Sequence, residues 1–141
     1  MELTPKQLSL IITSLRTLGE SGAQEKRRFT RVSVQAAIAA AELGGDALVR
    51  RWTALTRDVS AGGIGVLQST WLQGNVMLLL ALPFGDEMFH VIGQVVFCRP
   101  LADRVYTIGA RFIRTAEQGV TDEFNHWGEA QERRIQRAIL S

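Results

Sequence analysis

Two short motifs in the sequence carry residues that could bind an anionic ligand. The first is R-x-x-x-R from Arg27 to Arg31, inside a cluster of four basic residues within the six residues that start at Lys26, one of which is Arg28. Guanidinium groups hold phosphate oxygens through two parallel hydrogen bonds, so an anion site is one interpretation. A solvated basic segment is the other, and the motif alone does not separate them.

The second motif is D-x-S-x-x-G, which begins at Asp58 and runs through Ser60 and Gly62 to Gly63. A carboxylate accepts hydrogen bonds, a hydroxyl donates and accepts them, and glycine lets the backbone approach a ligand closely. Alone, the motif would be a polar turn between strands. The order of the two motifs and the β-rich sequence around them favour one shared binding site.

Most of the chain between these motifs and beyond them has the pattern of β-strands. Apolar and polar residues alternate from Val32 to Ile38. The Ala-rich run over residues 36–43 could be helical by propensity, but the turn signal at 44–46 favours a strand. Later segments rich in β-branched or large apolar residues are Ile64–Leu67, Val76–Leu82, His90–Cys98 and Val105–Ile113.

Turn-forming sequences separate these segments at residues 73–75, 84–86 and 99–103. The connections are too short for parallel crossovers, which need about a dozen residues or more. About six strands with short connections predict an antiparallel sheet that closes into a barrel.

Helices are predicted at both ends. Thr4 to Gln7 has the form of a capping box, and the apolar stripe that follows must pack on the barrel or on a partner. Near the other end, Thr121 is expected to cap a helix whose stripe from Phe124 to Ala138 could cover the barrel as a lid. We expect a helix and flexible connector over 1–24, a barrel over 25–116 and a C-terminal helix over 117–141.

The composition is that of a globular protein of one domain. The chain has 141 residues, of which 46% are hydrophobic and 21% charged. Its longest apolar run, Val76–Phe84, is under half the length of a membrane-spanning helix, and the first residues lack a signal-peptide pattern. A single cysteine, Cys98, excludes an intramolecular disulfide and fits a reducing compartment. We expect a cytoplasmic protein without membrane insertion.

Residues for catalysis or metal binding are sparse. His90 and His126 lie in different predicted elements, and together with Cys98 they are too few and too dispersed for a zinc site. Ser60 lies outside a G-x-S-x-G frame, and the glycines after it lack the Lys-Ser/Thr of a P-loop. The sequence therefore predicts no catalytic residue, no metal and no cofactor, and the chain is not expected to be an enzyme.

Taken together, these features resemble the PilZ domain family, bacterial receptors for cyclic di-GMP. The similarity covers roughly residues 25–113. It includes both motifs and a late strand of the form Y-x-x-G-x-x-F from Tyr106 to Phe112. The resemblance implies a mainly β fold, a six-stranded antiparallel PilZ-like barrel, here with an N-terminal and a C-terminal helix.

The resemblance also implies a set of ligand-binding residues for cyclic di-GMP. They are Arg27, Arg28, Arg31, Asp58, Ser60, Gly62 and Gly63. The arginines would hold phosphate and guanine, while Asp58 and Ser60 would read the guanine edge. Phe97 stands where relatives often carry an aromatic residue near the base, although a strand phenylalanine is more often part of a core.

The implied function is a receptor that relays the nucleotide signal. Ligand would order the connector over 19–31 and move the N-terminal helix, which changes a surface for an unidentified effector protein. The alternative is an adaptor of the same fold that contacts an acidic protein surface without the nucleotide. Binding of a nucleic acid polymer is not expected, because only Phe29 offers a stacking platform within the basic cluster. Ligand stoichiometry and homodimer formation stay open.

Overall fold

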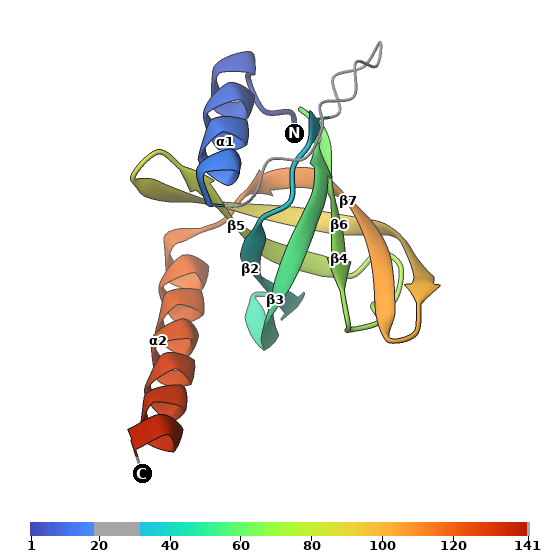
Figure 1. Ribbon diagram of the computed structural model, residues 1–141. Coiled ribbons are helices and arrows are strands. Elements are labelled where there is room, and N and C mark those ends of the chain that lie inside the picture. The colour runs from blue at the N-terminus through green and yellow to red at the C-terminus, as the bar shows by residue number, and fades with distance from the viewer. Residues whose placement is uncertain (19–31, 141) are drawn as a thin grey trace.

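The computed structural model of the chain describes residues 1–18 and 32–140. Helix α1 (Pro5–Leu18) comes first and helix α2 (Gln118–Leu140) last. The strands between them are β1 (Val32–Ser33), β2 (Ala37–Gly44), β3 (Ala47–Val59), β4 (Gly63–Gln68), β5 (Met77–Phe84), β6 (Glu87–Ala102) and β7 (Val105–Thr115). Figure 1 shows the strands wrapped into a barrel, with α1 at one end and α2 along its side.

Six of these strands form a closed antiparallel barrel in the order β3-β2-β5-β6-β7-β4. Pairing between β3 and β4 closes the ring, and the two-residue β1 adds to the end of β3. Closure satisfies the backbone donors and acceptors that an open sheet leaves at its edges. The prediction of a six-stranded antiparallel barrel with a helix at each end is confirmed.

The segment that leads into the barrel is less regular than a continuous strand, which the alternation of apolar and polar residues from Val32 to Ile38 predicts. The Ala-rich run is a strand, as expected, but β2 begins at Ala37 instead of Val32. Val34 and Ala36 are buried without joining a ladder. Two backbone bonds to β3 remain there, from the Val34 amide to the Arg57 carbonyl and from the Thr56 amide to the Ala36 carbonyl. The buried hydroxyl of Thr56 adds to them, because it donates to the Val34 carbonyl and accepts from the Ala36 amide at 2.9 Å.

The turn expected at residues 99–103 is displaced toward the C-terminus. β6 continues to Ala102, and the reversal falls at Asp103 and Arg104, where Arg104 has φ 58°. β5 pairs with β6 only as far as Gln94, so the later part of β6 has β7 as its one ladder partner. An edge of this kind tolerates Pro100, which has no amide hydrogen to donate.

Helix α1 closes one end of the barrel. The predicted capping box is confirmed, since the Thr4 amide donates to Gln7 Oε1 at 3.0 Å and the Gln7 amide to Thr4 Oγ1 at 3.1 Å. Ile11 and Leu15 are fully buried in the same cluster as the barrel interior. The apolar stripe of α1 therefore packs on the barrel, as the first of the two alternatives predicts.

Helix α2 packs outside the barrel. Phe124 is 1% exposed and lies among outward-facing residues of β2, β5 and β6 that include Ala41, Leu79 and Ile92. The expectation that the whole stripe of α2 forms a lid is wrong. Only its first part is covered, while Ile135 is 54% exposed and the helix continues past the barrel (Figure 1).

The start of α2 also differs from the prediction. The helix begins at Gln118, so Thr121 lies in its first turn and does not cap it. The Thr121 amide donates to the Glu117 carbonyl at 3.0 Å, a bond of the helical type. Thr121 is buried, which the capping preference of threonine did not indicate.

The described residues contain neither a membrane-spanning helix nor a metal-binding cluster. No helix within residues 1–18 and 32–140 is long and apolar enough to cross a membrane. Across the same residues, no cluster of three or more His, Cys, Asp or Glu side chains could hold a metal ion.

His90 predicts a pH dependence of stability. Its ring is half-buried and meets the Phe124 ring edge-on, with centroids 5.7 Å apart. Burial lowers the pKa of His90, and a hydrogen bond to Asn125 offsets part of that effect. The unfolded chain therefore binds the proton more readily than the folded one, and the free energy of unfolding falls as pH drops below about 6.5.

This pH dependence can be measured by urea unfolding at neutral and mildly acidic pH. His90→Gln should flatten the decline, and the same substitution at the exposed His126 is the control for loss of an imidazole. An identical decline in wild type and His90→Gln would show that another group is responsible.

Candidate functional site

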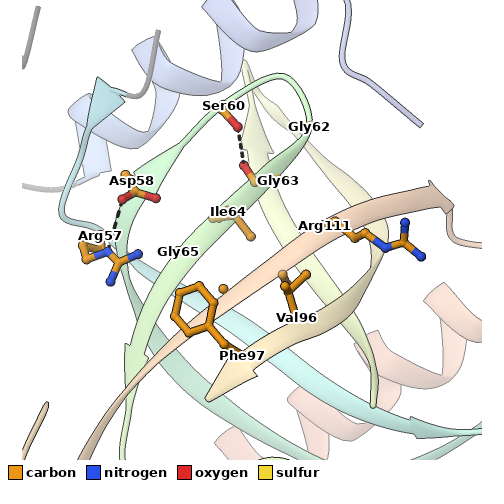
Figure 2. Close-up of a pocket in the computed structure, with 12 residues that line it drawn as sticks. Arg57, Asp58, Ser60, Gly62, Gly63, Ile64, Gly65, Val96, Phe97 and Arg111 are labelled. Atoms are coloured by element: carbon orange, nitrogen blue, oxygen red, sulfur yellow. Dashed lines mark hydrogen bonds and ion pairs between the residues drawn. The ribbon is translucent and has the colours of Figure 1, made fainter. Parts of the chain in front are cut away.

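A cavity of about 200 Å³ opens at the turn between β3 and β4 (Figure 2). The turn supplies one wall, and β6 and β7 supply the other. The lining residues are Arg57, Asp58, Ser60, Gly62, Gly63, Ile64, Gly65, Val96, Phe97, Gly109, Ala110 and Arg111. All four predicted residues of the D-x-S-x-x-G motif thus lie together at one cavity.

Local hydrogen bonds hold the turn. The Ser60 amide donates to the Gly63 carbonyl at 2.9 Å, and the Ser60 hydroxyl reaches the same oxygen at 3.4 Å. The Phe112 amide donates to the Gly62 carbonyl at 2.8 Å, which ties the turn to β7. The Ser60 hydroxyl keeps its acceptor lone pairs for a ligand.

The two glycines of the motif have different surroundings. A Cβ atom on Gly63 would lie 2.4 Å from the Ala110 carbonyl oxygen, so only glycine allows β4 to approach β7 this closely. A Cβ atom on Gly62 would have no neighbour within 4 Å among the described atoms. Gly63 therefore serves barrel closure, and Gly62 leaves open space beside the cavity.

This difference predicts the effect of two matched substitutions. Gly63→Ala forces backbone apart in the β4–β7 ladder and should lower the free energy of unfolding by roughly 1–3 kcal/mol. Gly62→Ala should change it by less than about 0.5 kcal/mol. Urea unfolding of both variants tests this, and equal losses would contradict the assignment.

Asp58 is held at the cavity by the arginine beside it. The Arg57 guanidinium donates from Nε to Asp58 Oδ2 at 3.2 Å and from Nη1 to the Thr107 hydroxyl. Asp58 Oδ1 and the Arg57 guanidinium both rest over Gly65, where a side chain would overlap them. One carboxylate oxygen of Asp58 is thus paired within the protein and the other is not engaged by this ion pair.

An aromatic ring forms the opposite part of the cavity (Figure 2). The Phe97 ring covers Gly109, whose Cβ would come within 2.3 Å of it, and the Arg99 guanidinium lies 4.8 Å from its centroid. A β-bulge between Val95 and Phe97 lets Val96, which is 61% exposed, and Phe97 line the same cavity. The predicted place of Phe97 beside the site is compatible with this geometry.

Several lining residues were missed by reasoning from sequence. Arg57 and Arg111 add positive charge at the cavity, and Arg111 is oriented by two hydrogen bonds to Gln94 Oε1 at 2.8 and 3.2 Å. Gly65 and Gly109 are direct cross-strand partners. Of these residues, the sequence could have indicated only Arg57, because it is adjacent to Asp58. The other three reach the cavity through the register of the strands.

The arginine motif lies outside the described residues, so Arg27, Arg28 and Arg31, like the connector over 19–31, receive no structural assignment. The described chain resumes at β1. There Val32 pairs with Val59 and Ser33 with Asp58, directly beside the cavity.

Comparison with known families adds an independent finding. The model of the PilZ domain matches residues 25–140, which includes the barrel and α2. The chain belongs to the PilZ domain family. A search of curated proteins finds no significant match.

Solved structures similar to this PilZ domain include MrkH from K. pneumoniae in complex with c-di-GMP, at 15% identity and a TM-score of 0.48 over 81% of this chain and 53% of that one. The c-di-GMP-bound PilZ domain of YcgR from Escherichia coli has 18% identity and a TM-score of 0.46, over 82% of this chain and 98% of that one. Apo MrkH has 14% identity and a TM-score of 0.45, with 82% and 55% coverage. The present chain therefore spans about half the length of MrkH.

Proposed function

We propose that this PilZ domain is a receptor for cyclic di-GMP. The ligand would occupy the cavity at the β3–β4 turn and be held there by Asp58, Ser60, Gly62 and Gly63 together with Arg27, Arg28 and Arg31. The observation that carries the proposal is the pairing of β1, because the chain that directly follows the arginine motif runs beside Asp58. In this proposal the two motifs, which are separated in sequence, meet at one cavity.

The chemistry of the cavity suits this ligand. Cyclic di-GMP carries two phosphodiesters, each with one negative charge, and two guanines. Arginine forks match the phosphate oxygens and the O6 and N7 acceptors of guanine, and the free oxygen of Asp58 can accept from guanine N1–H or N2–H₂. Phe97 lines the same cavity, and a base that stacked on its ring would take the place of the Arg99 guanidinium there. In this proposal the chain is a receptor, with no catalytic step and no cofactor.

The proposed relay passes through α1. The Leu3 amide donates to the Ala61 carbonyl at 2.7 Å, so the segment before α1 is bonded to the β3–β4 turn, residues 60–62, which we call the ligand turn. The other end of α1 leads into the connector that carries the arginines. A ligand that draws the arginines toward Asp58 would therefore pull on α1 through the connector at one end and through the Leu3–Ala61 bond at the other.

The packing of α1 limits the form of that relay. Complete release would expose Ile11 and Leu15, each at a cost of roughly 1.5–3 kcal/mol. We therefore propose a shift in how α1 is docked, which alters the surface presented to an effector protein and does not detach the helix.

One observation favours the alternative of a nucleotide-independent adaptor. Asp58 already has a partner in Arg57, so the cavity is partly satisfied without ligand. In that case the arginine motif would contact an acidic protein surface.

Calorimetric titration with cyclic di-GMP, with GTP as control, separates the two. Saturable heat for cyclic di-GMP alone supports the receptor. No heat at several temperatures, for protein shown to be folded, supports the adaptor. An affinity that falls steeply with salt would indicate a polyanion binder instead.

A further inference from the structure

A second cavity, of about 460 Å³, lies between β3 and α2, and none of its lining residues belongs to the first cavity. The lining residues are Arg51, His126, Trp127, Ala130, Gln131 and Arg134. Its charged and titratable side chains are all basic, and no acidic residue lines it. Its volume is within the range of binding pockets.

Arg51 is held in place at the floor of this cavity. Its guanidinium stacks on the Phe124 ring at 4.5 Å from the centroid, and Nη1 donates to Gln131 Oε1 at 3.3 Å. Gly128 makes room for it, because a Cβ there would lie 2.8 Å from Nη2. The positive charge is therefore fixed in orientation before any partner arrives.

The charge of Arg51 is poorly compensated. Among the described residues, Arg51 Nε is the one buried side-chain nitrogen or oxygen without a hydrogen-bond partner, and no carboxylate there forms an ion pair with this guanidinium. Burial lowers the pKa of Arg51, and the more distant Glu132 offsets only part of that effect. An anionic group bound nearby would stabilise the charged guanidinium.

An apolar stripe continues from the cavity along α2. Ile135 lies one helical turn beyond Gln131, and Ile139 follows one turn later. Their side chains are 54% and 75% exposed, and Figure 1 shows this end of the helix extending past the barrel. Isoleucines exposed in series on a helix are typical of a surface that packs on another protein.

We propose that this surface, from Arg51 to Ile139, binds an acidic amphipathic segment of a partner protein. Carboxylates of the segment would pair with Arg51 and Arg134, and its apolar face would pack on Trp127 and Ile135. The surface is separate from the ligand cavity and from α1. The proposal therefore stands whether or not the chain binds cyclic di-GMP.

Charge and shape select this occupant over others. In a two-fold dimer the same patch meets itself, so a second copy would bring basic groups toward basic groups. A nucleic acid polymer would satisfy the arginines but would leave the isoleucine stripe uncovered. An acidic segment with an apolar face complements both features.

The test uses the full chain and two synthetic amphipathic helices. One peptide carries leucine on one face and glutamate on both flanks, and the matched peptide carries lysine in place of glutamate. Fluorescence anisotropy gives affinities, and ¹H–¹⁵N NMR locates the contact. We expect the glutamate peptide alone to bind, with shift changes from His126 to Ile135.

Matched variants make the test specific. Arg134→Glu should weaken the glutamate peptide roughly tenfold, because it replaces an attraction with a repulsion. Arg133→Glu is the control, since the neighbouring arginine is exposed but does not line the cavity, and it should change affinity much less. Circular dichroism confirms that both variants fold.

Any one of five results would overturn the proposal. The two peptides bind equally, or Arg133→Glu weakens binding as much as Arg134→Glu. Shift changes at residues 58–65 would place the peptide in the ligand cavity. Self-association in sedimentation that Arg134→Glu abolishes would assign the surface to a second copy, and Arg134-dependent binding to anionic phospholipid vesicles would assign it to a membrane.

Discussion

Replacing Asp58 with alanine should weaken binding of cyclic di-GMP at least tenfold. The substitution removes the carboxylate proposed to accept from the guanine edge, and loss of a charge-assisted hydrogen bond costs roughly one to a few kcal/mol. Arg31→Ala should have a comparable effect, because the arginine motif is proposed to hold the same ligand. Calorimetry of wild type and both variants measures the change.

The pairing of Asp58 with Arg57 sharpens the interpretation. Without Asp58, the Arg57 guanidinium loses its ion-pair partner but keeps its bond to the Thr107 hydroxyl, and the uncompensated positive charge at the cavity should if anything favour an anionic ligand. A loss of affinity would therefore come from the missing acceptor. Asp86→Ala, in the exposed β5–β6 turn, is the control and should bind as wild type does. Wild-type affinity in Asp58→Ala would refute its proposed role.

Leu15→Ala should cause the largest loss of stability among the substitutions considered. The side chain is 0% exposed and links α1 to the barrel interior. Truncation of a buried leucine removes apolar burial and leaves a cavity, at a cost of roughly 2–5 kcal/mol. Leu18→Ala, in the same helix but 63% exposed, should cost less than about 0.5 kcal/mol. Urea unfolding compares the two.

The same pair of variants also tests the relay. If docking of α1 is coupled to the ligand turn through Leu3 and Ala61, Leu15→Ala should change the affinity for cyclic di-GMP although it lies outside the cavity. Leu18→Ala should not. An unchanged affinity in a folded Leu15→Ala variant would separate α1 from the binding site.

Part of the site was predictable because it is local in sequence. Asp58, Ser60, Gly62 and Gly63 lie within one turn, and the chemistry of each residue type is visible without a fold. The contributions of other strands were not predictable. Arg111 reaches the cavity through the register of β4 and β7, which pairs it with Gly63, and a bulge in β6 brings Val96 to the same cavity as Phe97.

The helices show the same limit. Helical periodicity identified the buried faces around Leu15 in α1 and Phe124 in α2, but it did not say what each face would meet. α1 closes the barrel end, a role that the sequence had suggested for α2. Which surface each helix covers depends on where the chain enters and leaves the barrel. The local sequence of a helix does not contain that information.

Barrel closure has a consequence for the order of folding. The hairpins β2–β3, β3–β4, β5–β6 and β6–β7 join neighbours in sequence. Two pairings, β2–β5 and β4–β7, join strands that are distant in sequence, as the pairing of Ile64 with Ala110 shows for the second. Such non-local contacts carry a larger loop-closure entropy and generally form more slowly. The ligand turn and the opposite wall of the cavity come together only when β4 pairs with β7. We therefore expect the refolding chain to become able to bind the proposed ligand last, after most of its secondary structure has formed.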